Sequence, residues 1–207
     1  LPLLMLSALG NQQIFNSYLV WGSANFQLDL AGFRMEVTDL VSVDAIISTA
    51  FIILSLLFWR WWAKRWTEPN EITKLTIGVL ISALAPLLLA FAAWQQVATG
   101  EKASLFWGIG FHVVNSIGFA NVFPVGLALY SRASPRAVAG LMIGVYYVHL
   151  FAATMLVGRI GGFLETMEAG QFWLMHAGLV AAGGLGLLVA RAFVGRILAP
   201  ERSEAPS

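Results

Sequence analysis

The sequence contains no cysteine and few charged residues, and each shortage excludes a class of protein. Without cysteine the chain forms no disulfide, thiolate nucleophile or cysteine-ligated metal site. Only 11% of the 207 residues are charged whereas 58% are hydrophobic, which leaves too little polar surface to cover a soluble globule. The net charge is +1, and no basic stripe follows the pattern of a phosphate backbone, so we expect no nucleic-acid partner. The composition places the chain in a lipid bilayer.

Catalytic motifs are missing as well. The apolar segments carry no Ser/His/Asp order, no His-Glu-x-x-His run and no pair of carboxylates. The glycine-rich stretches lack the Lys followed by Ser or Thr that a phosphate loop requires. We therefore expect no enzyme activity, no cofactor and no metal site.

Six long apolar segments make up most of the sequence. A membrane-spanning helix needs about 20 mostly apolar residues, and the candidates are residues 3–28, 40–59, 75–100, 103–131, 137–158 and 169–190. Because lipid offers no hydrogen-bond partner to the backbone, segments of this length form helices. The sequence thus predicts an all-α membrane protein, with one six-helix unit over residues 1–199 and a polar cytoplasmic tail over residues 200–207.

The connections between these segments alternate in charge. Nine of the twelve Lys and Arg residues follow the second, fourth and sixth segments, and three lie in the other connections. Because cytoplasmic loops carry the excess of Lys and Arg, we expect both chain ends in the cytoplasm and the protein in the cell inner membrane. The Trp-rich segment 59–66 is predicted to anchor at the interface, with a lipid-head-group site as the alternative.

The start of the chain is unusual for a complete protein. The first residue is Leu1, and no charge appears before Asp29. A secretory signal peptide would be shorter and would begin with basic residues. We therefore expect a chain that begins inside a longer protein.

Proline and glycine mark expected bends and close contacts within the segments. Pro124 removes a backbone donor, so the fourth segment should bend there, and Pro86 can act similarly in the third. Several glycines are predicted to allow close helix packing, with hinge motion as the alternative. They are Gly140, Gly144, Gly158, Gly161, Gly162, Gly183, Gly184 and Gly186.

Two linked motifs in the fourth and fifth segments resemble a known family. They read Phe106-Trp107, Asn115-Ser116-Ile117-Gly118-Phe119, Phe123-Pro124-Val125-Gly126-Leu127, Ser134-Pro135 and Gly140-Leu141-Met142-Ile143-Gly144-Val145-Tyr146-Tyr147. They resemble the proton-dependent oligopeptide transporter (POT) family of the major facilitator superfamily. Its tenth helix runs Trp, Gly-Glu-Leu and Ser-Pro-Val-Gly-Leu, and its eleventh opens Gly-Leu-Met-Met-Gly-Val-Trp-Phe. The resemblance implies helices seven to twelve of a twelve-helix transporter, with a missing amino-terminal half as partner.

The resemblance also implies where substrate would bind. Gln12 and Gln13 take the positions of the Glu-Gln pair in the family's seventh helix, and Phe119 takes that of a pocket Glu. Asp44 replaces a pocket Asn, and Tyr146 replaces a Trp. The family's Glu-x-x-Glu-Arg signature for proton coupling belongs to its first helix, outside this sequence.

One face of the fourth segment supports a cavity there. His112, Asn115, Ser116, Phe119 and Phe123 recur at helical spacing on one side, and such a mixed polar and aromatic stripe should not face lipid. The alternative is that Asn115 and Ser116 bond neighbouring helices while His112 points outward near the periplasm.

The predicted substrate site therefore comprises six residues, and three further polar residues are given structural roles. The predicted site residues are Gln12, Gln13, Asp44, Asn115, Phe119 and Tyr146. His149 and His176 are expected to be structural or interfacial, and Asn121 is expected to make a packing contact.

Asp44 is the only acid well inside a predicted span, with Ser48 one turn further on the same face. An ionised carboxylate in hydrocarbon is costly, so such a residue normally faces a cavity, where it takes up a proton or binds a cation. We therefore predict that Asp44 couples transport to protons. In the alternative the helix begins later, and Asp44 lies at the outer interface beside Asp39.

Together these patterns predict a proton-coupled symporter of small peptides or related small polar solutes. A non-transporting receptor or scaffold with the same fold is the second hypothesis, favoured by Gln12 and Phe119 at positions where the family has acids. A major-facilitator transporter of a non-peptide substrate is the third.

The charge asymmetry generates a test of topology. Reporters fused after Arg65, Arg132 and Arg196 should report a cytoplasmic location, whereas reporters after Arg34, Lys102 and Glu165 should report the outside. The measurement is the activity of a compartment-specific reporter in intact cells. A reporter at Lys102 that is active in the cytoplasm would overturn the arrangement of spans.

Overall fold

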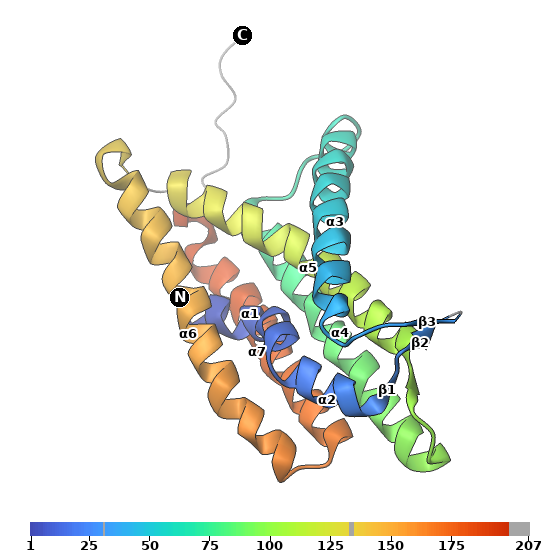
Figure 1. Ribbon diagram of the computed structural model, residues 1–207. Helices are drawn as coiled ribbons and strands as arrows, with labels where there is room; N and C mark the ends of the chain where they lie inside the picture. The colour runs from blue at the N-terminus through green and yellow to red at the C-terminus, as the bar shows by residue number, and fades with distance from the viewer. Residues whose placement is uncertain (31, 133–134, 199–207) are drawn as a thin grey trace.

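The computed structural model describes residues 1–30, 32–132 and 135–198 as a bundle of long helices (Figure 1). The predicted tail at residues 200–207 and the motif residue Ser134 lie outside this part of the chain. Within it, five helices are long and apolar enough to cross a membrane. They are α3 (Asp39–Ala63), α4 (Glu71–Thr99), α5 (Leu105–Arg132), α6 (Ala139–Gly161) and α7 (Ala169–Leu198). Each coincides with one of the last five predicted segments.

The first predicted segment is broken. It consists of α1 (Pro2–Gln12), a 3₁₀ turn η1 (Gln13–Phe15) and α2 (Ser17–Asn25). At Asn16 the backbone leaves the helical region, with φ −135° and ψ −109°. Two side chains accompany the break, because Gln13 Oε1 accepts from the Ser17 amide at 3.2 Å and Asn16 Nδ2 donates to the Val157 carbonyl at 3.1 Å. The expected single helix over residues 3–28 is therefore replaced by two shorter ones.

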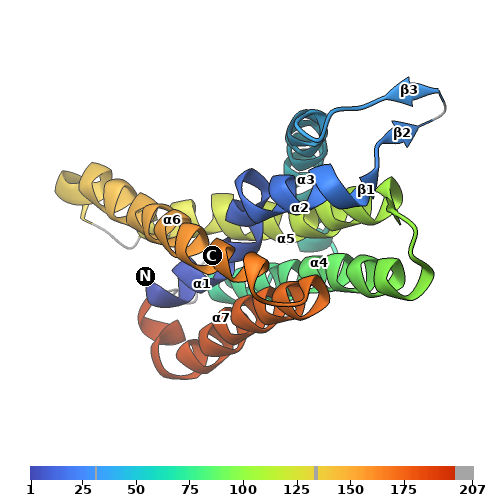
Figure 2. The ribbon, with the colours of Figure 1, turned by 60° about the horizontal axis from the view of Figure 1, so that its bottom comes forward.

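Short strands and turns join the helices. β1 (Phe26–Gln27) pairs in parallel with β4 (Ala103–Ser104), and β2 (Asp29–Leu30) pairs antiparallel with β3 (Phe33–Arg34). The 3₁₀ turns η2 (Arg136–Val138) and η3 (Gly162–Glu165) precede and follow α6. The strands lie at one end of the bundle, where β1 follows α2 and the β2–β3 hairpin extends beyond it (Figure 2).

The centre of the bundle is α4, which packs against α5 on one side and α7 on the other. α1 packs against α6 and α7, whereas α3 packs mainly against α5. Figure 2 shows α3 and α7 on opposite sides of the layer formed by α4 and α5. Of the residues of α3 only Leu40 and Asp44 are buried, so α3 is the least enclosed long helix.

The α4–α5 contact depends on glycine. A Cβ on Gly118 would overlap Ser82 Oγ and come within 2.5 Å of the Gly78 carbonyl oxygen. A Cβ on Gly78 would come within 2.7 Å of the Gly118 carbonyl oxygen. The two backbones can approach this closely only because both positions lack a side chain.

The predicted packing glycines fall into two groups. A Cβ at Gly161, Gly183, Gly184 or Gly186 would press on neighbouring atoms, as close packing requires. A Cβ at Gly140, Gly144, Gly158 or Gly162 would meet nothing within 4 Å. Within the part of the chain that the structure describes, the packing prediction is therefore wrong for the second group, because no other element lies against these four positions.

Substitution at Gly118 tests the α4–α5 crossing. Gly118→Ala should destabilise the protein by about 1 to 3 kcal/mol, since the extra methyl group forces the two helices apart. Gly178→Ala is the matched control on α7, because a Cβ there meets nothing within 4 Å, and alanine is the better helix former. Thermal unfolding of the purified full-length protein should show a lower melting temperature for Gly118→Ala and an unchanged or higher one for Gly178→Ala. Equal effects of the two substitutions would contradict the crossing.

Candidate functional site

A ladder of polar side chains joins α3 to α5. Asp44 Oδ1 lies 2.8 Å from His112 Nδ1, and the Ser48 and Ser116 hydroxyls lie 2.9 Å apart. Both pairs are separated by 68 residues, so the two helices run parallel in constant register. Ser48 also reaches Asp44 Oδ2 at 3.5 Å. The ladder places an acid and an imidazole in direct contact inside the protein.

The ladder continues toward the carboxyl end of α3. Ser55 Oγ and Trp59 Nε1 both donate to Asn121 Oδ1, at 3.1 and 2.7 Å. Asn121 was expected to make a packing contact, and this contact consists of two hydrogen bonds to α3. Trp59, from the predicted interfacial anchor, therefore also fixes α3 to α5.

Asp44 and His112 are both enclosed. Asp44 is 8% exposed and His112 is fully buried. Since α3 begins at Asp39, Asp44 lies inside the helix, and the alternative of a later helix start is wrong. The outward-pointing alternative for His112 is also wrong. The sequence placed His112 on the cavity face but gave no sign that Asp44 would be its partner.

Tyr18, whose hydroxyl forms no hydrogen bond to the described residues, lies next to this pair. The ring of Tyr18 meets the His112 ring edge-on, with centroids 4.9 Å apart. Among the described residues, the Tyr18 hydroxyl and His112 Nε2 are buried without hydrogen-bond partners. The pair therefore borders polar atoms that are free to take part in proton transfer or to bind water.

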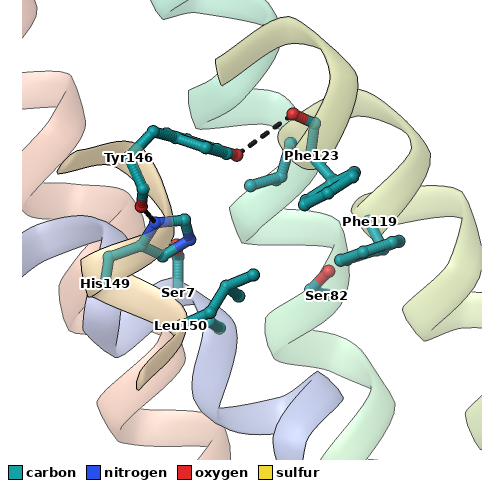
Figure 3. Close-up of a pocket in the computed structure, with 9 residues that line it drawn as sticks. Ser7, Ser82, Phe119, Phe123, Tyr146, His149 and Leu150 are labelled. Carbon is teal, nitrogen blue, oxygen red and sulfur yellow. Dashed lines mark hydrogen bonds between the residues drawn. The ribbon is translucent and has the colours of Figure 1, made fainter. Parts of the chain in front are cut away.

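A separate pocket lies between α1, α4, α5 and α6 (Figure 3). Its volume is about 10 Å³, which is the room that one water-sized group needs. Phe119 and Tyr146, both predicted site residues, lie in its wall. The lining residues are Ser7, Ala8, Ser82, Phe119, Val122, Phe123, Tyr146, His149 and Leu150.

Aromatic packing shapes the pocket. The rings of Phe119 and Phe123 stack with centroids 5.2 Å apart, and the Tyr146 hydroxyl donates to the Phe123 carbonyl at 3.0 Å. Gly126 makes room for Tyr146, because a Cβ there would come within 2.7 Å of the phenol oxygen. The glycine of the Pro-Val-Gly-Leu motif thus positions the tyrosine of the next helix.

Three polar pocket residues were not predicted as site residues. They are Ser7, Ser82 and His149, and His149 was expected to be structural or interfacial. His149 is 2% exposed and bonds through Nδ1 to the Tyr146 carbonyl. Because His149 follows Tyr146 by three residues, the two share one face of α6, and that spacing could have identified it.

The structure does not bring the other predicted residues to this pocket. Gln13 is buried against α7, with Nε2 at 2.6 Å from His176 Nε2. Gln12 accepts from Thr154 of α6 at 3.3 Å. Asn115 donates to Asn11 of α1 at 3.0 Å, and its Oδ1 has no partner among the described residues. These contacts hold α1 against α5, α6 and α7.

Comparisons with known proteins give a consistent result. No protein-family model matches the chain. The peptide transporter YePEPT of Yersinia enterocolitica is 26% identical over 138 residues, which are 65% of this chain and 26% of that protein. A di-/tripeptide transporter of Lactococcus lactis is 25% identical over 169 residues, 70% of this chain and 34% of that protein. The chain thus spans about a quarter to a third of the length of these curated relatives.

Solved structures show the same fold. A crystal structure of a peptide transporter POT with sulfate superposes with a TM-score of 0.83 at 19% identity, over 97% of this chain and 40% of that one. A POT family transporter in complex with 5-aminolevulinic acid gives a TM-score of 0.77 at 20% identity, over 91% and 39%. The resemblance in the helix motifs is confirmed by both comparisons. The chain is homologous to one part of the peptide transporters of the POT family.

Proposed function

We propose that this chain is the carboxy-terminal half of a proton-coupled symporter of small peptides or related small polar solutes. The observation that carries the proposal is the pocket, whose wall contains both Phe119 and Tyr146. The motif resemblance gives these two residues the positions of the family's pocket residues. The curated relatives named peptide transporters support the same function. Substrate, protons, the lipid bilayer and the missing amino-terminal half are the proposed partners, and the inner membrane is the proposed location.

The broken first segment forms the sixth span in this proposal. α1, η1 and α2 contain 11, 3 and 9 residues, and together they are long enough to cross a bilayer. Discontinuous helices occur in transporters where neighbouring side chains satisfy the freed backbone groups. Gln13 and Asn16 supply such bonds here.

The exposed faces of α3 and α6 support a missing half. Ile46 of α3 is 72% exposed, and Phe151 of α6 is 67% exposed. The pocket admits only a water-sized group, which is too little for a peptide, so a second wall is required. We assign that wall to the amino-terminal half, whose rocking against this one would alternate access to the site.

The Asp44–His112 pair is the proposed site of proton coupling. At 2.8 Å the two groups share a hydrogen bond whether they hold one proton or two. With one proton the pair is negative, and with a second proton it becomes neutral overall. Because an unbalanced charge is costly inside a membrane, protonation changes the stability of the α3–α5 contact.

One observation favours the receptor or scaffold as a second candidate. Among the residues that the structure describes, no Asp or Glu lines the pocket, although the family has acids at the positions of Gln12 and Phe119. A chain that has lost these acids can keep the fold without moving substrate. Proton-driven accumulation of a peptide separates the two candidates.

Asp44→Asn tests the coupling. In the full-length protein this variant should lose proton-driven accumulation of dialanine by at least tenfold at unchanged expression, because the pair can no longer change charge through the acid. Uptake into proteoliposomes with an imposed pH gradient measures it. Asp39→Asn, the same change at an exposed position of α3, is the control. Wild-type accumulation and pH dependence in Asp44→Asn would exclude Asp44 as the coupling group.

Phe119→Glu tests the pocket. The substitution restores the family's acid in the pocket that Tyr146 also lines, and it should change the substrate range or the pH dependence of uptake. The measurement is competition of a peptide panel against labelled dialanine at two pH values. An identical profile in a well-expressed variant would show that this face does not line the substrate path.

A further inference from the structure

Gln13 is the centre of a chain of hydrogen bonds that links the break in the first segment to α7. Its Oε1 accepts from the Ser17 amide at 3.2 Å, and its Nε2 lies 2.6 Å from His176 Nε2. His176 Nδ1 in turn lies 2.9 Å from the Phe172 carbonyl oxygen. Ser17 is the first residue of α2, where a backbone amide has no partner within the helix. Gln13 therefore supplies a bond that the start of α2 needs.

These contacts fix which atoms carry the hydrogens. The Ser17 amide only donates, so the oxygen of the Gln13 side chain faces Ser17 and its NH₂ group faces His176. The Phe172 carbonyl only accepts, so the hydrogen of the His176 ring is on Nδ1. Nε2 must then accept from Gln13, which requires a neutral ring. In this one state all four groups of the chain are paired.

A proton on His176 Nε2 would break this chain. Nε2 would become a donor that faces the NH₂ group of Gln13, which also donates. Turning the Gln13 amide over would pair its oxygen with His176, but the NH₂ group would then face the Ser17 amide, and two donors would meet again. No orientation of Gln13 satisfies both neighbours once His176 is charged. These three residues are at most 2% exposed, so water does not replace the lost bond.

The charge of a protonated His176 would also have no partner among the described residues. The elements with the most extensive contact with α7 are α4, α1 and η3. α1 and the adjoining η1 contain no ionisable side chain, and α4 carries only Glu71 and Lys74, which form ion pairs near its start. η3 contributes Glu165, which is exposed, and α2 contributes Tyr18, a phenol. Because an unbalanced charge is costly inside a membrane, protonation favours leaving this arrangement.

We propose that His176 is a positioning residue whose protonation releases the break between α1 and α2. While its ring is neutral, His176 holds Gln13, and Gln13 holds the start of α2. As the pH falls and the ring takes up a proton, the bond to the Ser17 amide is lost and the break loosens. The site is separate from the Asp44–His112 pair, whose side chains form none of these bonds. The inference goes beyond the proposed transport function and does not rest on it, because it concerns the conformation of the first segment.

Hydrogen–deuterium exchange of the full-length protein in detergent, read by mass spectrometry, tests the proposal. Exchange is measured between about pH 8 and about pH 4.5, a range that includes the usual titration of histidine, and is expressed as protection factors because intrinsic exchange itself depends on pH. The segment 14–20 reports on the break, and the segment 83–93 in the buried part of α4 is the internal reference.

Three variants accompany the wild type. His176→Gln keeps an acceptor in the side chain but takes up no proton in this pH range, whereas His176→Leu removes the acceptor. Glu168→Gln is the control, because it removes a titratable group at an exposed position just before α7.

In the wild type and in Glu168→Gln, protection of segment 14–20 should fall roughly fivefold or more from the high to the low pH, since the loss of one hydrogen bond has an effect of this order. The reference segment should not change. His176→Gln should keep its protection at both pH values, and His176→Leu should have low protection at both.

Two results would overturn the proposal. One is protection of segment 14–20 that does not depend on pH in the wild type, which is what a merely structural histidine gives. The other is wild-type pH dependence in His176→Gln, because the proton would then bind elsewhere. If His176→Gln fails to fold, loss of the pH dependence in His176→Leu supports the proposal and its retention contradicts it. Peptide uptake enters none of these measurements, so their outcome is independent of the proposed function.

Discussion

A polar side chain inside a bilayer has to find its hydrogen-bond partner within the protein, because lipid supplies none. This constraint organises the molecule more than its apolar contacts do. Lipid tails are as apolar as leucine, so burying leucine between two membrane helices gains little. Contacts that distinguish one helix arrangement from another must therefore come from hydrogen bonds and from close backbone packing. The chain uses hydrogen bonds for α3 and close backbone packing for α4 with α5.

α3 is held in place by hydrogen bonds. Most of its surface is exposed and apolar, and the bonds of Asp44, Ser48, Ser55 and Trp59 join it to α5. Because these bonds lie on one face, they fix the rotation of α3 as well as its position. The same residues thus serve as structure and as proposed chemistry. A proton that binds Asp44 or His112 changes the contact that holds the whole of α3 against α5.

The sequence predicted the five long helices because their length and hydropathy suffice to define them. It did not predict the break near Asn16, since hydropathy over residues 3–28 contains no information on backbone angles. The bonds that accompany the break come partly from Val157, which is 141 residues away. For the pocket, the motif resemblance identified Phe119 and Tyr146. Ser7 was missed because its proximity to the pocket depends on how α1 packs, which helical periodicity does not reveal, whereas the spacing from Tyr146 to His149 did carry a signal for His149.

The glycine contact between α4 and α5 has a mechanical consequence. Backbones that interlock at Gly78 and Gly118 cannot slide past one another by a fraction of a turn without steric overlap. α4 and α5 therefore move together as one rigid unit, with α7 packed along α4. Any displacement applied at the β4 end of α5 is transmitted along its length instead of being absorbed by sliding. The parts of this chain that can move relative to the rigid α4–α5 unit are then α3 and the break between α1 and α2, which flank it.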